Sequence, residues 1–149
     1  MRNSMVVAST AETDRIGKDE VPAKSQMLKW LYWISTLYIA VTMLLVGATA
    51  ILHAPPFFNE FRRLGYPDYF STLLGAWKVL GAVALLTPGY PLVKEWAYAG
   101  FFIDFTGALA AYAAVGGGAE KFSGPLLATL ALIVSWYLRP PSRRLVPQM

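Results

Sequence analysis

The sequence predicts an all-α integral membrane protein, an antiparallel four-helix transmembrane bundle. The first observation is composition: of the 149 residues, 56% are hydrophobic and 15% are charged, whereas soluble domains carry about 25% charged residues. The second is that the apolar residues fall into four long runs separated by turns rich in proline and glycine. The third is that basic residues gather at the ends of these runs, as the positive-inside rule describes.

The first apolar run covers residues 28–52 and follows a polar segment of mixed charge. Residues 1–24 show no apolar periodicity, which predicts a disordered tail. About 20 apolar residues span a bilayer core, so the run at 28–52 is long enough to cross with some tilt. A signal peptide cleaved after Ala50 is the alternative, but the run is longer than the apolar region of a typical signal peptide.

Helix-breaking residues separate the later elements. Pro55 and Pro56 end the first span, and the phenylalanines and arginines after them predict a short interfacial helix. The remaining spans are predicted at 67–87, 93–115 and 124–138. Pro125 is expected in the first turn of the last span, because proline suits that position. The membrane domain is therefore expected at 25–139, followed by a short basic tail at 140–149.

Four spans place both ends of the chain on one side of the membrane. The basic residues close to the spans on that side are Lys24, Lys29, Lys94, Arg139, Arg143 and Arg144. Those on the other side are Arg62, Arg63 and Lys121. Because short loops rich in Lys and Arg stay in the cytoplasm, both termini are expected there.

Two of the predicted spans carry a charge in the middle of an apolar run. Lys78 and Asp104 lie equally far from Pro91, which stands in the turn between their spans. Antiparallel helices therefore put both charges at one depth, which makes them candidate partners in an intramembrane ion pair. Ionisable residues inside a membrane are functional candidates. The alternative is that the pair only fixes the register of the two helices.

Small residues let helices approach closely in lipid, and each predicted span carries a polar or small stripe. These stripes are Ser35, Thr42 and Thr49; Ser71, Gly75, Lys78 and Ala82; Gly100, Asp104, Gly107 and Ala111; and Gly124, Ala128, Ala131 and Ser135. They predict that Lys78 and Asp104 face the inside of the bundle. Glu95 is an accessory candidate that either faces the same interior or lies in water beside Lys94.

Aromatic residues accompany the two charges. They could line a pocket for a flat lipophilic ligand, or they could form the belt at the membrane interface. The residues concerned are Trp77, Trp96, Tyr98, Phe101, Phe102, Trp136 and Tyr137. The belt is the preferred interpretation, since Trp96 and Trp136 fall near predicted helix ends.

The sequence argues against several kinds of site. The chain has no cysteine, which excludes a disulfide, a redox cysteine pair or a thiolate ligand. Its single histidine, His53, makes a haem or zinc site built by this chain alone an unfavoured hypothesis. There is no phosphate-binding loop and no basic patch with interleaved aromatics, so nucleic-acid binding is not expected. No cofactor is expected within the chain itself, and a bound quinone is left open.

Several short motifs of the central stretch recur together in one known family. They are Leu64-Gly65-Tyr66-Pro67, Gly75 with Lys78, Leu80-Gly81-Ala82, Pro88-Gly89, the run KEWAYAGF from Lys94 to Phe101, and Asp104. In these motifs the chain resembles the DoxX-like family of small bacterial membrane proteins over about residues 28–138. The resemblance implies four membrane helices, and the family's recurrent polar positions match Lys78, Glu95 and Asp104. The family's name comes from a relation to the membrane subunit of a thiosulfate:quinone oxidoreductase, and some relatives are associated with membrane redox complexes.

Three functions are compatible with these observations. The first is a non-catalytic subunit or anchor in the lipid bilayer, attached to a membrane redox partner protein. The second is a quinone- or lipophile-binding oxidoreductase component that uses Lys78 and Asp104, since a buried pair can hold shifted pKa values. The third is a small ion- or proton-linked transporter, which would need a homodimer to form a pathway. They are preferred in that order, and whether the chain is an enzyme stays open.

Overall fold

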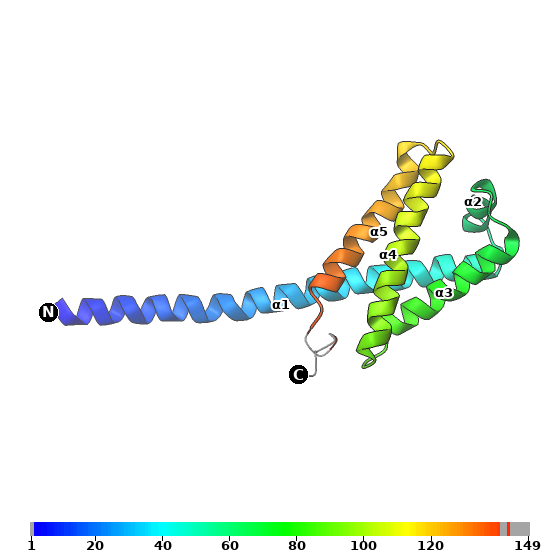
Figure 1. The fold of residues 1–149 in the computed structure, drawn as a ribbon. Coiled ribbons are helices and arrows are strands. Elements are labelled where there is room, and N and C mark those ends of the chain that lie inside the picture. The colour runs from blue at the N-terminus through cyan, green and yellow to red at the C-terminus, as the bar shows by residue number, and fades with distance from the viewer. Residues whose placement is uncertain (1, 141–142, 144–149) are drawn as a thin grey trace.

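The computed structural model describes the backbone of residues 2–140 and 143 and the side chains of residues 25–140 and 143. Five helices make up the fold (Figure 1), and the described part of the chain contains no strand. They are α1 (Arg2–Ile51), α2 (Phe57–Arg63), α3 (Asp68–Leu86), α4 (Pro91–Ala114) and α5 (Ala119–Tyr137). The predicted all-α fold is confirmed, and so is the short helix expected after Pro56, which is α2.

Three segments are long and apolar enough to cross a membrane: Ser25–Ile51, Asp68–Leu86 and Pro91–Ala114. The fourth predicted span corresponds to α5, which has 19 residues and is therefore about 28 Å long at 1.5 Å per residue. It lies antiparallel beside α4 (Figure 1). The helices thus alternate in direction as the sequence predicts, while the four-span topology itself remains a prediction.

The four long helices form two antiparallel pairs that cross. One pair is α1 with α3 and the other is α4 with α5, and the pairs converge at one end and diverge at the other (Figure 1). We call the converging end, where α3 passes into α4, the closed end. We call the diverging end, where α2 lies, the open end. The crossing leaves room between the pairs toward the open end.

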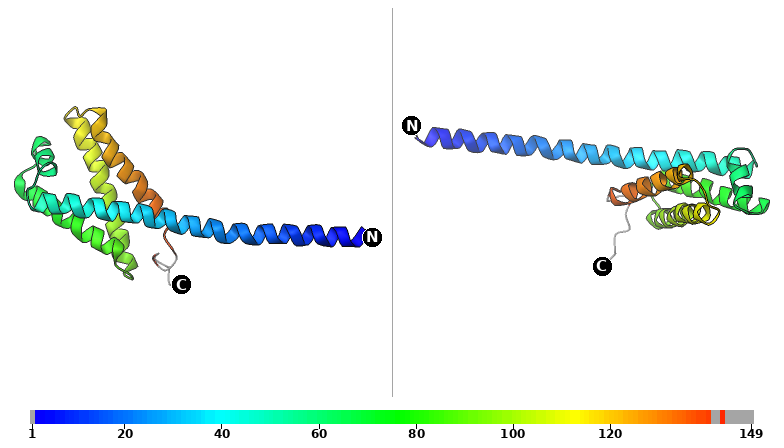
Figure 2. Two further views of the ribbon diagram at one scale, coloured as in Figure 1. Left: turned by 180° about the vertical axis from the view of Figure 1, so that it is seen from behind. Right: turned by 90° about the horizontal axis from the view of Figure 1, so that it is seen from above.

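The N-terminal part of α1 corrects a prediction. The sequence predicts a disordered tail over residues 1–24, whereas α1 runs as one helix from Arg2. This part projects far beyond the other helices (Figures 1 and 2). The prediction rested on the lack of apolar periodicity, which reports whether a helix has a packing partner. Backbone hydrogen bonds within a helix need no such partner.

The start of α5 also differs from the prediction. The helix begins at Ala119, after Gly118 in an extended conformation, so Pro125 lies inside the helix and not in its first turn. Proline lacks the backbone N–H that would continue the hydrogen-bond ladder at this point. The Thr129 hydroxyl donates to the carbonyl of Pro125 at 2.7 Å. The prediction that Pro125 opens the helix is wrong, because the polar residues before it extend the helix by a turn and a half.

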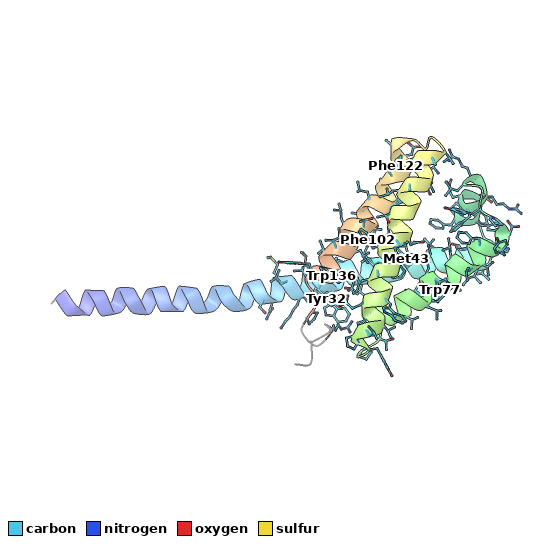
Figure 3. The ribbon with its side chains drawn as sticks, in the orientation of Figure 1. Tyr32, Met43, Trp77, Phe102, Phe122 and Trp136 are labelled. Atoms are coloured by element: carbon cyan, nitrogen blue, oxygen red, sulfur yellow. The ribbon has the colours of Figure 1, made fainter. Side chains whose placement is uncertain are left out.

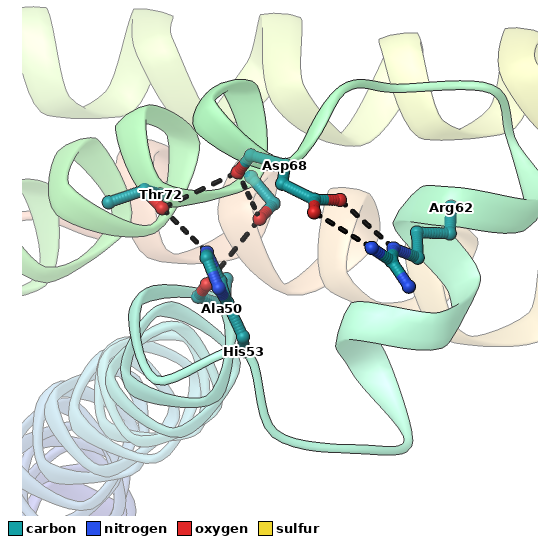
Figure 4. A network of polar contacts seen from close by, with 6 residues as sticks. Ala50, His53, Arg62, Asp68 and Thr72 are labelled. Carbon is teal, nitrogen blue, oxygen red and sulfur yellow. Dashed lines mark hydrogen bonds and ion pairs between the residues drawn. The ribbon is translucent and has the colours of Figure 1, made fainter.

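Polar contacts join α2 and the turn after α1 to the start of α3 (Figure 4). The Arg62 guanidinium donates to both carboxylate oxygens of Asp68, at 2.9 and 2.8 Å. These hydrogen bonds raise the pKa of Arg62. His53 Nε2 lies 2.9 Å from the Thr72 hydroxyl. The contacts hold the connection between α1 and α3, so that α2 stays at the open end.

The core lies where the two pairs cross. It is formed by Ile39, Ala40, Met43, Ala82, Leu85, Ala97, Tyr98, Phe101, Phe105, Ala128 and Leu132. Figure 3 places Met43 near this crossing and Tyr32 and Trp136 toward the closed end. Many large apolar side chains, such as Trp77 and Ile103, are exposed on the outside of the helices. An apolar outer surface on apolar helices is suited to contact with lipid.

Candidate functional site

The position of Lys78 is set by a close approach of α1 and α3. A Cβ atom built on Gly47 would lie 2.8 Å from the carbonyl oxygen of Gly75, and one built on Gly75 would lie 2.7 Å from that of Gly47. Only glycine at both positions lets the two backbones come this near. The Cβ of Lys78 packs against the same contact. The helix pair therefore holds the base of the lysine rigidly while its ammonium group reaches toward α4.

Lys78 and Asp104 are in contact. Nζ of Lys78 donates a hydrogen bond to Oδ1 of Asp104 and forms an ion pair with it. The exposed fraction is 8% for the lysine side chain and 21% for the aspartate side chain. The two charges that the sequence places at one depth thus meet between α3 and α4. A buried charge is expensive without a partner, so the contact offsets part of the cost of placing each of these charges between the helices.

The pair lies on the wall of a cavity of about 480 Å³ between the two helix pairs. All five helices contribute to it. The walls are mostly apolar and aromatic, and they include Tyr38, Thr42, Met43, Phe57, Phe61, Tyr66, Phe70, Phe105, Gly107, Tyr112, Gly124 and Pro125. A cavity of this size with few polar groups matches the usual site of a small ligand.

A second ion pair lies at the open end of the same cavity. Lys121 at the start of α5 donates to Glu60 of α2 at 2.7 Å, and Glu60 lines the cavity. This contact joins the two helix pairs where they diverge. The cavity therefore has one ion pair deep between the helices and another near its open end. The sequence analysis did not name Glu60, which lies in the predicted interfacial helix, and counted Lys121 only as a flanking basic residue.

Glu95, the third predicted site residue, lies elsewhere. It accepts hydrogen bonds from Arg139 at 2.7 Å and from the indole of Trp136 at 3.2 Å. Among the described residues, no contact joins Glu95 to Lys78 or Asp104. Of the two alternatives left open for Glu95, the structure shows neither a contact with the pair nor a side chain free in water: it faces the last turn of α5 at the closed end. Arg139 is 4% exposed and was read from the sequence as a flanking basic residue only.

Hydroxyl groups and cations fill the closed end. Ser135 on α5 lies 2.7 Å from both the Thr36 hydroxyl and the Tyr98 hydroxyl, so one serine joins three helices. Lys94 donates to the carbonyl of Ala84 at 2.8 Å and also to that of Thr87. Arg143 donates to the carbonyl of Leu85 at 3.0 Å. Cationic side chains thus satisfy the free carbonyls at the end of α3, as they commonly do at helix C-termini.

The predicted stripes pack unequally. On α3 all four members are buried, as expected: Ser71, Gly75, Lys78 and Ala82. On α4 the buried residues are Lys94, Ala97, Tyr98, Phe101 and Phe105, whereas Gly100 and Gly107 are exposed. The predicted packing face of α4 is therefore wrong. Its bulky aromatic face packs against the core, and its small residues leave open space beside Asp104.

The aromatic residues divide between the two interpretations. Trp77, Trp96 and Phe101 line a groove between α3 and α4. Tyr98 is buried at the closed end, and Phe102, Trp136 and Tyr137 are exposed. The cavity itself has aromatic residues from α1, α3 and α4, and three more from α2 and the loop after it, which are Phe57, Phe61 and Tyr66. Sequence reasoning missed these because it assigned them to an interfacial helix, for which aromatic residues are equally typical.

These features define a helical membrane protein with several candidate spans and an ion pair between two of them. The DoxX-like family matches residues 34–137 of the chain, which covers the four long helices from within α1 to the end of α5. The chain belongs to the DoxX-like family. No curated protein and no solved structure matches it. The resemblance predicted from the motifs around Lys78 and Asp104 is thereby confirmed.

Proposed function

We propose that this DoxX-like protein binds a lipophilic molecule with a flat polar head, of the quinone class, as a component of a membrane redox complex. The observation that carries the proposal is the Lys78–Asp104 pair on the wall of a largely apolar cavity. A pair with a purely structural role has no need of open space beside it. A ligand site needs apolar walls and a few polar groups at one place, and the cavity has both.

The residues present fit such a ligand. The cavity of about 480 Å³ lies within the usual range of small-molecule sites. Phe57, Phe61 and Phe70 offer aromatic faces to a flat ring. Lys78 offers a charged donor, and Asp104, which is the more exposed partner, offers an acceptor.

The proposed roles of the two side chains follow from their chemistry. The Lys78 ammonium donates to a carbonyl oxygen of the head, and the Asp104 carboxylate accepts from a hydroxyl group. A quinone, when bound, supplies the capacity to take up two electrons and two protons. Asp104 can hold a proton at its free oxygen, which makes it the candidate for proton exchange with the ligand. The apolar walls exclude water and so strengthen these contacts.

The proposal also assigns a place in a complex. With no cysteine and a single histidine in the sequence, electrons must be delivered by a partner protein. We infer a membrane redox protein as this partner. A homodimer is compatible with this role, but the second copy has the same composition and is not the electron donor. A subunit that only anchors its partner is the second candidate, since the outside of the bundle carries many exposed apolar side chains. No observation favours the transporter hypothesis.

We further propose that both termini lie in the cytoplasm, with the protein in a bacterial inner membrane. The closed end carries Lys94, Arg139 and Arg143, and the basic residues of the open end are Arg62, Arg63 and Lys121. Lys29 adds to the closed end, where the last turns of α5 pack beside the part of α1 around Thr36. The domain limits expected from the sequence, with a cytoplasmic segment before residue 25 and a basic tail after residue 139, belong to this proposal.

The test is extraction of the tagged protein from its membrane in mild detergent, followed by mass spectrometry of the attached proteins and organic-soluble molecules. We expect a lipophilic molecule in about equal amount to the protein, and a loss of about tenfold in Asp104→Asn, which keeps the shape of the side chain. Glu120→Gln is the matched control, because Glu120 is exposed at the start of α5 and lies outside the cavity. A partner protein without any lipophile would instead establish the anchor role.

A further inference from the structure

A second hollow lies on the other side of the Lys78–Asp104 pair. It is a groove of about 350 Å³ between α3 and α4. Four residues line both the groove and the cavity: Leu74, Lys78, Ile103 and Asp104. The ion pair therefore stands between two hollows, and each hollow reaches it from a different direction.

The groove differs from the cavity in the residues that line it and in the direction in which it opens. Apart from the ion pair, every residue that lines it is apolar or aromatic. Its rim carries Trp77 and Trp96, which are 64% and 71% exposed, together with Leu80 and Val93. All of these lie on α3 and α4, two of the candidate membrane spans. The groove thus opens toward the hydrocarbon of the bilayer, whereas α2 lies over the cavity at the open end.

We propose that this groove holds the hydrocarbon tail of the molecule whose polar head lies at the Lys78–Asp104 pair in the cavity. The inference rests on the proposed function and adds that the ligand is amphiphilic, with a tail. The head needs the donor and acceptor of the pair. A tail that starts beside the pair can continue over Leu74 and Ile103, which line both hollows. Through the groove such a tail passes the ion pair over these two apolar side chains and reaches the membrane.

The glycines of α4 provide a way to separate the two hollows. Gly100 lines the groove and Gly107 lines the cavity. A Cβ atom built on either glycine would have no neighbouring atom within 4 Å. A leucine at either position therefore projects into open space. Gly81 is unsuitable, because its Cβ would lie 2.7 Å from the ring of Phe101. Gly100→Leu and Gly107→Leu are thus matched variants on one helix, with the same change and different targets.

The experiment compares two probes with one naphthoquinone ring, menadione without a tail and menaquinone-4 with one. Each is titrated against the purified full chain in detergent, and binding is followed by quenching of tryptophan fluorescence. For each probe, the variant is compared with the wild type, so that partition into the micelle cancels. Gly100→Leu is expected to weaken menaquinone-4 about tenfold and menadione by no more than about twofold. Gly107→Leu is expected to weaken both probes about tenfold.

Other results would overturn either this inference or the proposed function. If Gly100→Leu weakens both probes equally, or neither, the groove does not hold the tail and the inference is overturned. If the wild type binds neither probe, the proposed function itself is overturned for this class of ligand, and the inference about the groove falls with it. If Gly100→Leu does not fold, Val93→Phe serves in its place, because Val93 is exposed on the rim of the same groove. Folding is checked by the thermal unfolding midpoint and by gel filtration.

Discussion

Two buried ion pairs connect the helices of this bundle. One is surrounded by further protein contacts, and the other borders open space. Arg139 and Glu95 at the closed end have side chains that are 4% and 27% exposed, and Lys78 and Asp104 have values of 8% and 21%. The degree of burial is therefore similar. Arg139, however, also donates to the carbonyl of Trp136 at 3.1 Å and lies over the ring of Tyr98. Lys78 and Asp104 have only each other among the hydrogen-bond partners in the described part of the chain, and they border two hollows.

This difference separates a structural pair from a candidate site. Arg139 of the Arg139–Glu95 pair also contacts the carbonyl of Trp136 and the ring of Tyr98, so that a ligand would have to displace protein contacts. The Lys78–Asp104 pair keeps free hydrogen-bonding capacity next to open space. Ionisable groups inside a membrane are commonly functional, but burial alone does not distinguish these two pairs. The unfilled space around one of them does.

The largest effect is expected from Arg139→Met. This change leaves Glu95 without its cation and removes the contacts to Trp136 and Tyr98, and breaking a buried pair on one side costs about 3–5 kcal/mol. We expect the free energy of unfolding to fall by this amount, measured by chemical or thermal unfolding in detergent micelles. Arg143→Met is the control, because Arg143 pairs with no carboxylate among the described residues. Equal losses for both variants would mean that the closed end depends on cation packing and not on the ion pair.

The second effect concerns the pair at the cavity. Lys78→Met or Asp104→Leu alone leaves a charge unpaired between the helices, which costs about 2.5–3.5 kcal/mol on insertion scales. The double variant is expected to recover much of this loss, because it leaves no charge behind. The measurement is a double-mutant cycle on the free energy of unfolding. Simple addition of the two single effects would show that the side chains do not interact in the membrane.

A smaller effect is expected from Gly75→Ala. The added Cβ would lie 2.7 Å from the carbonyl of Gly47, so α1 and α3 must separate. Overpacking of this kind costs about 1–3 kcal/mol, and the shift moves Lys78 as well. Gly107→Ala is the matched control, since nothing lies within 4 Å of its Cβ. Unfolding midpoints that fall alike in both variants would contradict the close approach of the two helices.

The smallest effect is expected from Lys121→Gln, which breaks the contact with Glu60 at the open end. Both side chains are about a third exposed, and pairs at such positions contribute about 0–1 kcal/mol. The unfolding midpoint should therefore change little, and the remaining difference should shrink at high salt. A loss as large as that of Arg139→Met would show that the open end is held by this pair, contrary to the comparison between the two ends.

How much of the site was predictable can be seen from its residues. The contact between Lys78 and Asp104 followed from their equal distance from the turn, because residues equally far from the turn of an antiparallel helical hairpin lie at the same depth. Glu95 and Arg139 also lie equally far from Gly117, in the turn between α4 and α5, so the same argument would have paired them; the sequence analysis applied it only to the turn between α3 and α4. Depth is a property of one helix and its turn. The direction in which a side chain points across the bundle depends on how the pairs cross.

The sequence by itself determined the class of protein, the order and approximate limits of the helices, and the depth of the two central charges. These follow from hydropathy, helix breakers and spacing, which act within one segment or between neighbours. Only the tertiary structure decided that α4 packs with its aromatic face and leaves its small residues open. The same crossing of the two helix pairs created the cavity and the groove beside Lys78 and Asp104. Such space arises from the angle between helices, and side-chain packing over the whole bundle sets that angle.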